Sequence, residues 1–119
     1  MRGKRVLALA AALALTAATG AEAATLTIDV PEATDVETTT VHYMCGEMPV
    51  TVDYINAGPV SLAVLHLPDE LVVAANVISG SGARYAGGKY IWWSSGAGTT
   101  LADLQNGGED NPTSCTEQE

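Results

Sequence analysis

Short runs of apolar and β-branched residues, separated by turn-forming residues, recur along most of the chain. Runs of this kind, bounded by Gly, Pro, Asn or Asp, are typical of β-strands. They predict strands at residues 25–30, 38–43, 50–55, 61–67, 71–78, 90–94 and 99–104. About seven or eight short strands at near-regular spacing predict an all-β fold, an antiparallel sandwich or barrel.

The segment 71–77 is the main ambiguity in this pattern. It is a short apolar run that contains Ala74 and Ala75, and such a run can be buried as a helix or as a strand. Its valines and the following Ile78 are β-branched, which favours a strand.

The N-terminus follows a different pattern. Three basic residues precede an unbroken apolar run at 6–15, which is too short to span a bilayer and leads to Ala21-Glu22-Ala23. A signal peptidase accepts this small-x-small pattern. We therefore predict a cleaved signal peptide at 1–23 and a periplasmic or secreted protein; a retained membrane anchor is the alternative. No cysteine stands at the cleavage site to accept a lipid, so the mature chain is expected to have no membrane anchor.

Three further regions are predicted after the signal peptide. Residues 24–37 are expected to hold an N-terminal strand and an acidic linker, and residues 38–115 the folded β domain. The polar residues 116–119 are expected to be a disordered tail.

The charge of the chain limits its partners. Fourteen acidic residues against five basic ones give a net charge of −9, which becomes −11 when the signal peptide leaves with three basic residues and Glu22. Nucleic acids and anionic membrane surfaces require Lys and Arg, and only Arg84 and Lys89 then remain. The charge argues against both nucleic acid and an anionic membrane surface as partners, and it favours a basic protein.

The two cysteines, Cys45 and Cys115, are expected to form one disulfide, because exported thiols usually pair. No Cys-x-x-Cys spacing exists, and His42 and His66 have no partnering motif. The sequence therefore predicts no metal site and no cofactor.

The segment Ser79-Gly80-Ser81-Gly82-Ala83-Arg84-Tyr85 is a candidate binding loop. Its glycines permit positive φ, which would let Ser81 project from a tight loop, and Arg84 could donate to a carboxylate. The alternative is an ordinary β-turn with a solvated Ser81.

This loop lacks the signatures of common catalytic and nucleotide sites. It has no P-loop ending, no third glycine at the dinucleotide spacing and no Gly-x-Ser-x-Gly elbow. His42 or His66 could activate Ser81 only if the fold brought them together, so we predict that the protein is not an enzyme.

Trp92 and Trp93 lie in the adjacent aromatic segment. Consecutive residues of a strand point to opposite faces, so one tryptophan is expected in the core and the other outside, near the loop. An outward tryptophan is a binding candidate, and packing over both rings is the alternative.

Several of these features together resemble the MliC/PliC family of bacterial inhibitors of C-type lysozyme. The resemblance is carried by Tyr43-x-Cys45, Val50-x-Val52-x-Tyr54-x-Asn56, Ser81-Gly82-Ala83-Arg84-Tyr85, Tyr90-x-x-Trp93, Gly96 and Cys115. It implies an eight-stranded antiparallel barrel over 38–115 and a C-type lysozyme as partner. It also implies that the Ser81 loop enters the lysozyme cleft and binds its catalytic carboxyl groups, with Tyr85 and Trp93 shaping its support.

One position departs from the family pattern: Ser95 stands where the second family motif has Lys. The loss of this cation is expected to weaken binding unless Lys89 or Arg84 substitutes for it. The competing interpretation is a barrel that binds another basic protein or a glycan. The sequence does not decide the oligomeric state, with a homodimer as the alternative to a monomer.

Overall fold

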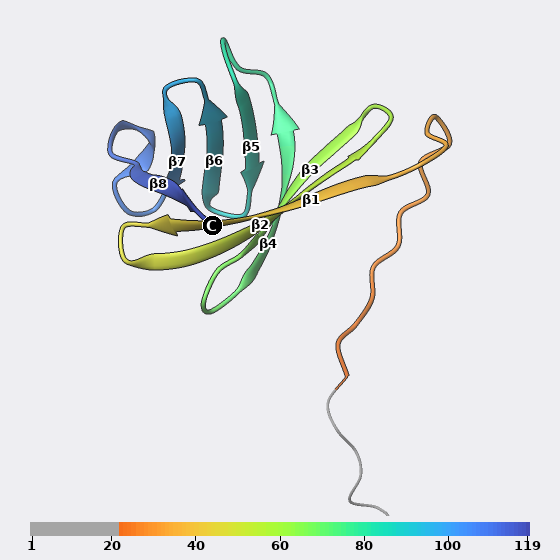
Figure 1. Cartoon of the computed structure of the whole chain (residues 1–119), viewed down its shortest axis with the longest axis horizontal. Helices are drawn as coiled ribbons and strands as arrows, with labels where there is room; N and C mark the ends of the chain where they lie inside the picture. The colour runs from red at the N-terminus through yellow and green to blue at the C-terminus, as the bar shows by residue number, and fades with distance from the viewer. Residues whose placement is uncertain (1–21) are drawn as a thin grey trace, which may run out of the picture.

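The computed structural model describes residues 22–119, so residues 1–21, which hold most of the predicted signal peptide, lie outside the described part. Eight strands form a closed antiparallel barrel in chain order, with β8 returning to pair with β1 (Figure 1). They are β1 Glu37–Cys45, β2 Met48–Ala57, β3 Val60–His66, β4 Leu71–Val77, β5 Ala83–Gly87, β6 Tyr90–Ser95, β7 Gly98–Asp103 and β8 Thr113–Gln118, with a 3-10 turn η2 at Gly108–Asp110. The predicted all-β barrel is confirmed, and the ambiguous segment at 71–77 is a strand.

Alternate residues of the strands fill the barrel interior, as the period of a strand requires. The largest fully buried side chains are Trp92, Leu65, Val50 and Val52. Within 22–119 no helix is long and apolar enough to cross a membrane.

Three aromatic side chains join their polar groups inside the barrel. The Trp92 indole Nε1 donates to the Tyr54 hydroxyl at 2.8 Å, and the hydroxyls of Tyr54 and Tyr43 are 2.8 Å apart. The rings of Tyr43 and Trp92 pack edge to face with centroids 4.9 Å apart. Burial, followed by the Tyr54 hydrogen bond, raises the pKa of Tyr43 above its usual range. Because these polar groups satisfy one another, they hold β6 in one register against the core.

The predicted disulfide between Cys45 and Cys115 is confirmed. The two residues are direct register partners on β1 and β8, so the bond lies across the seam where the last strand closes the barrel. Both cysteines are buried.

The prediction of a strand at 25–30 is wrong. These residues alternate in the sequence but form no regular element, and Leu26 and Ile28 are 81% and 64% exposed. A strand needs a partner with free backbone groups, and a closed barrel leaves no edge for a further strand.

The prediction of disorder for the C-terminal tail is also wrong for residues 116–118, which belong to β8. Met44, Tyr43 and His42 of β1 pair with them in register. Ladder hydrogen bonds join backbone groups, so this polar segment forms a strand without an apolar pattern.

A carboxylate on the outer face of β2 links three strands and gives the fold a pH-dependent contact. Thr40 donates to one oxygen of Asp53 at 2.6 Å, and Nε2 of His66 lies 2.8 Å from the other. The hydrogen bond from Thr40, followed by that from His66, lowers the pKa of Asp53. A depressed pKa contributes stability at neutral pH, and that contribution is lost as the pH falls through the folded-state pKa.

Asp53→Asn is therefore expected to destabilise the protein at pH 7 by less than about 1 kcal/mol, since the pair is partly exposed. The difference from wild type should shrink as the pH falls below the usual Asp pKa of about 4, because wild-type Asp53 then becomes protonated as well. Urea unfolding at neutral pH and in acid measures it. Asp69→Asn removes an exposed carboxylate from the β3–β4 connection and is the control. A difference that stays constant with pH would contradict the assignment.

Candidate functional site

Two connections lie at the same end of the barrel and form the candidate site. The Ser81 loop (residues 78–82) joins β4 to β5, and residues 96–97 join β6 to β7 (Figure 1). They are neighbours because β5 and β6 form a hairpin in which Ala83 pairs with Ser94. The hairpin register thus brings the Gly-Ser-Gly segment beside the end of the aromatic strand.

Gly82 is the residue that lets the Ser81 loop lie against β6. Its φ is +69°, and a Cβ at this position would be 2.5 Å from the Ser94 carbonyl oxygen and 2.7 Å from the Ser95 Cβ. A side chain would therefore both strain the backbone and overlap β6. At Gly80 an added Cβ meets nothing within 4 Å.

Hydrogen bonds hold the backbone of the Ser81 loop. The indole Nε1 of Trp93 donates to the Ser81 carbonyl at 2.9 Å. The Ser79 hydroxyl lies 3.1 Å from the carbonyl oxygens of both Ser81 and Gly82. Ser81 itself is exposed, and no group among residues 22–119 forms a hydrogen bond with its hydroxyl. The loop is therefore fixed while its hydroxyl points to solvent.

The two tryptophans take opposite faces of β6, as predicted. Trp92 has no exposed surface, whereas Trp93 lies on the outer face and is partly exposed. Tyr85, another predicted support residue, is in the core, where burial raises its pKa, and its ring centroid is 6.0 Å from that of Tyr54. The buried Trp92 and Tyr85 thus anchor β6 and β5 in the core, and Trp93 contacts the loop from the outer face of β6.

Arg84 lies on the outer face beside Trp93, its register partner. The guanidinium carbon is 5.7 Å from the centroid of the Trp93 ring, a cation–π distance. Its Nη2 and Nε donate to the same Glu109 oxygen, at 2.8 and 3.3 Å. Glu109 belongs to η2 in the β7–β8 connection.

Lys89 and Tyr90 are placed elsewhere. They lie at the β5–β6 turn, at the other end of the hairpin from Ser81, about five residues or 17 Å along the strand. Lys89 Nζ is 3.2 Å from Asp103 Oδ2, and this contact raises the pKa of Lys89. The Tyr90 hydroxyl donates to Glu70 at 3.1 Å; burial, followed by this hydrogen bond, raises the pKa of Tyr90. The structure therefore does not bring Lys89 and Tyr90 to the loop.

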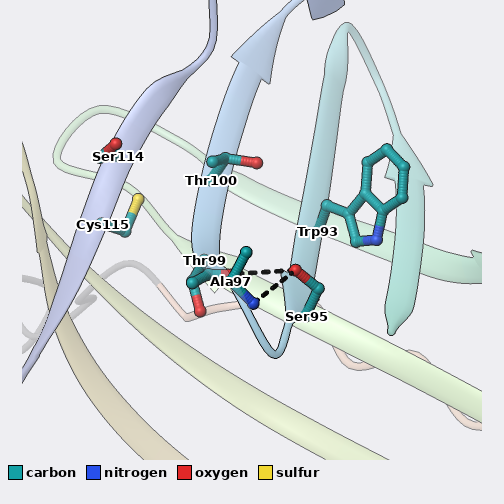
Figure 2. A pocket seen from close by; sticks show the side chains of 8 residues that line it. Trp93, Ser95, Ala97, Thr99, Thr100, Ser114 and Cys115 are labelled. Atoms are coloured by element: carbon teal, nitrogen blue, oxygen red, sulfur yellow. Dashed lines mark hydrogen bonds between the residues drawn. The ribbon is translucent and has the colours of Figure 1, made fainter. Parts of the chain in front are cut away.

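Ser95 borders an open pocket of about 370 Å³ lined by residues of β6, β7, β8 and the β6–β7 turn (Figure 2). Hydroxyl groups from all three strands line it, those of Ser95, Thr100 and Ser114, with Trp93 at its side. The Ser95 hydroxyl turns back into its own turn, where it donates to the Gly98 carbonyl at 3.4 Å and accepts the Ala97 N–H at 3.3 Å. The Ser95 hydroxyl therefore does not project into the site as a polar group that a partner could contact.

The remaining candidate chemistry is not assembled here. His66 pairs with Asp53 and His42 with Thr51 on β1–β3, and neither histidine bonds Ser81 within the described chain. Residues 22–119 contain no group of three His, Cys, Asp or Glu side chains placed to hold a metal.

Residues 43–111 match the sequence model of a family described as membrane-bound lysozyme inhibitor of C-type lysozyme, MliC. The chain belongs to the MliC family. The MliC match includes the Ser81 loop, Arg84, Trp93 and Glu109.

Two curated relatives carry the name membrane-bound lysozyme inhibitor of C-type lysozyme. One, from Pseudomonas aeruginosa, is 46% identical over 76 residues, which are 62% of this chain and 60% of that protein. The other, from Cupriavidus necator, is 38% identical over 108 residues, 87% of this chain and 86% of that protein. The relatives are thus named as inhibitors and as membrane-bound proteins.

A solved structure supports the same relationship. It is the crystal structure of Pseudomonas aeruginosa MliC in complex with hen egg white lysozyme, 36% identical, with a TM-score of 0.67 over 84% of this chain and all of that one. The barrel described above is therefore the MliC fold.

Sequence reasoning missed the contacts of two residues that shape this candidate site. Glu109 holds Arg84 from a distant connection, and no local pattern marks it. The Ser79 hydroxyl bonds two carbonyl oxygens of the loop. A serine near the start of a glycine-rich turn often bonds the backbone of that turn, so its position was a weak signal for this contact.

Proposed function

We propose that this protein is a periplasmic inhibitor of C-type lysozyme that occludes the active-site cleft with the Ser81 loop. The observation that carries the proposal is the exposed Ser81 hydroxyl on a loop whose backbone is held by Trp93 and Ser79. A preorganised loop loses little conformational freedom on binding, which favours affinity. The complex that a 36% identical MliC forms with hen egg white lysozyme supports the choice of target.

The chemistry of the target suits this loop. A retaining or inverting glycosidase uses two carboxyl groups that flank the bond to be cleaved, one protonated and one ionised. A hydroxyl can donate to a carboxylate and accept from a carboxylic acid. An inserted Ser81 would therefore bind these groups in the place of the sugar and exclude substrate without any reaction of its own.

The acidic character of the chain supports a basic partner. Opposite net charges raise the rate of encounter at low ionic strength, and the net charge of −11 after signal cleavage is large for a chain of this size. Association with lysozyme is therefore expected to be fastest in low salt.

A cell-wall lysis assay with the purified mature protein and hen egg white lysozyme tests the proposal. Lysis should slow as the inhibitor approaches a molar excess in low salt. The competing interpretation, a barrel that binds another basic protein or a glycan, requires unchanged lysis at several-fold excess, and that result would remove the proposal.

Ser81→Ala is expected to weaken lysozyme binding about tenfold to a hundredfold. Hydrogen bonds to charged groups contribute about 1.5 to 3 kcal/mol, and most of the loss should appear as faster dissociation. Surface plasmon resonance with immobilised lysozyme measures both rate constants. Thr38→Ala, at an exposed position at the start of β1, is the control and should bind as wild type. Equal dissociation rates for Ser81→Ala and Thr38→Ala would show that the hydroxyl does not contact the target.

We also propose that the mature chain starts at Ala24 and is soluble in the periplasm, unlike the relatives that are named membrane-bound. The pattern that ends at Ala23 supports cleavage there. Osmotic shock should release the protein, and mass spectrometry should give the mass of residues 24–119. Recovery with the membrane fraction would overturn this location.

A further inference from the structure

The cationic groups of the mature chain are few, and each has an acidic partner. Arg84 and Lys89 are its only Lys and Arg residues. Lys89 pairs with Asp103 at the far end of the hairpin, whereas Arg84 pairs with Glu109 beside Trp93. Within residues 22–119, Arg84 is therefore the one Lys or Arg side chain near the Ser81 loop.

We propose that Arg84 is the cation with which this site binds a carboxylate of its partner, and that Glu109 occupies Arg84 in the free protein and competes with the partner for it. This inference rests on the proposed inhibition of lysozyme. It assigns to Arg84 the positive charge that the family motif places on a lysine at position 95, where this chain has Ser95.

The geometry of the ion pair leaves room for an exchange. Both donating atoms of Arg84 meet one oxygen of Glu109, so the parallel two-oxygen arrangement that a guanidinium prefers with a carboxylate is not formed. The Glu109 side chain is 43% exposed and belongs to a short 3-10 turn. The Arg84 side chain is 23% exposed, so the pair is partly open to solvent, and such pairs contribute little to stability; a partner carboxylate that offers both oxygens can therefore displace Glu109.

Trp93 couples Arg84 to the loop. Its ring lies under the guanidinium, and its Nε1 binds the Ser81 carbonyl. Arg84 and Ser81 are thus held by the same side chain, one by its π face and one by its N–H. A cleft with two carboxyl groups could then meet the hydroxyl at one and the guanidinium at the other.

The position of Ser95 supports the assignment to Arg84. The Ser95 hydroxyl is occupied within its own turn, and the space beside it is an open pocket. The cation of this site therefore comes from β5 rather than from the end of β6.

Four variants in the mature protein test the inference by lysozyme binding. Arg84→Gln is expected to weaken binding about tenfold to a hundredfold, because it removes a charged hydrogen bond to the partner. Glu109→Gln is expected to tighten binding up to about fivefold, because it frees Arg84. Asp110→Asn removes the same charge from the neighbouring position and should leave the affinity for lysozyme unchanged. Lys89→Gln should bind as wild type.

A double variant and a rescue separate this mechanism from a structural role. In the Arg84→Gln background, Glu109→Gln should no longer tighten binding, since the two changes act on one contact. Adding Ser95→Lys to Arg84→Gln should restore affinity, since it returns a positive charge to the site. Circular dichroism and thermal unfolding of each variant should match wild type within a few degrees.

The outcomes distinguish this inference from the proposed function. If wild type fails to inhibit lysozyme, the proposed function fails and the assignment of Arg84 fails with it. If wild type inhibits and folded Arg84→Gln binds equally well, only the inference on Arg84 is overturned. Equal tightening by Glu109→Gln and Asp110→Asn would overturn the competition by Glu109.

Discussion

Cys45→Ala combined with Cys115→Ala is expected to lower the free energy of unfolding by about 4 kcal/mol. The cysteines are 70 positions apart, and a cross-link that closes a loop of this length restricts the unfolded chain strongly. Small domains have total stabilities of only about 5 to 15 kcal/mol, so the loss is a large share. The bond also lies where β8 pairs with only the last four residues of β1.

Urea unfolding of the double variant and of reduced wild type checks this expectation, and the two midpoints should coincide. Ser114→Ala keeps the disulfide but changes an exposed neighbour on β8, and it is the control. A midpoint shift equivalent to less than about 1 kcal/mol would mean that the β1–β8 hydrogen bonds close the barrel without the disulfide.

The strands with one buried face could be predicted from the sequence, and those without such a face could not. In β2 the buried Val50 and Val52 alternate with less buried residues, and this pattern alone indicates a strand. In β8 Cys115 is the only buried residue. That segment is a strand because β1 and β7 supply its backbone partners, a long-range fact that no local pattern contains.

The segment 25–30 shows the opposite case. Its alternation equals that of true strands, but pairing depends on a free edge, and closure of the barrel is a property of the whole chain. The short β5 was missed for a related reason. Its sequence Ala-Arg-Tyr-Ala-Gly follows the glycine-rich loop directly and has one buried residue, Tyr85, to mark it.

At the candidate site, local motifs predicted the components but not their contacts. Glycine content predicted the exposure of Ser81, and strand parity predicted that one tryptophan points outward; that this one is Trp93 is known only from the structure. The two cations could not be told apart, since only the hairpin register shows that Arg84 lies beside Trp93 and Lys89 at the opposite turn. Glu109 reaches Arg84 from 25 positions away, and that contact depends on the path of the β7–β8 connection.

Gly82→Ala is expected to weaken lysozyme binding about a hundredfold or more while the barrel stays folded. Alanine at a φ of +69° costs about 1 to 2 kcal/mol, and relieving the overlap of its Cβ with Ser94 and Ser95 costs about 1 to 3 more. The overlap is relieved at the lowest free-energy cost by a shift of the Ser81 loop away from β6, since the loop lies outside the core. This shift would break the bond from Trp93 to the Ser81 carbonyl and move the hydroxyl out of position.

Gly80→Ala is the matched control for this effect, because it adds the same methyl group to the same loop where nothing lies within 4 Å. It should bind lysozyme within about twofold of wild type, since its Cβ meets no neighbour and surface changes away from such contacts alter stability by only about 0.5 kcal/mol. Calorimetric titration of both variants with lysozyme, beside their thermal unfolding curves, separates loss of the loop geometry from loss of the fold. If Gly82→Ala binds as tightly as Gly80→Ala, the packing of the loop against β6 is not what presents Ser81. Inhibition would then have to come from another part of the acidic surface.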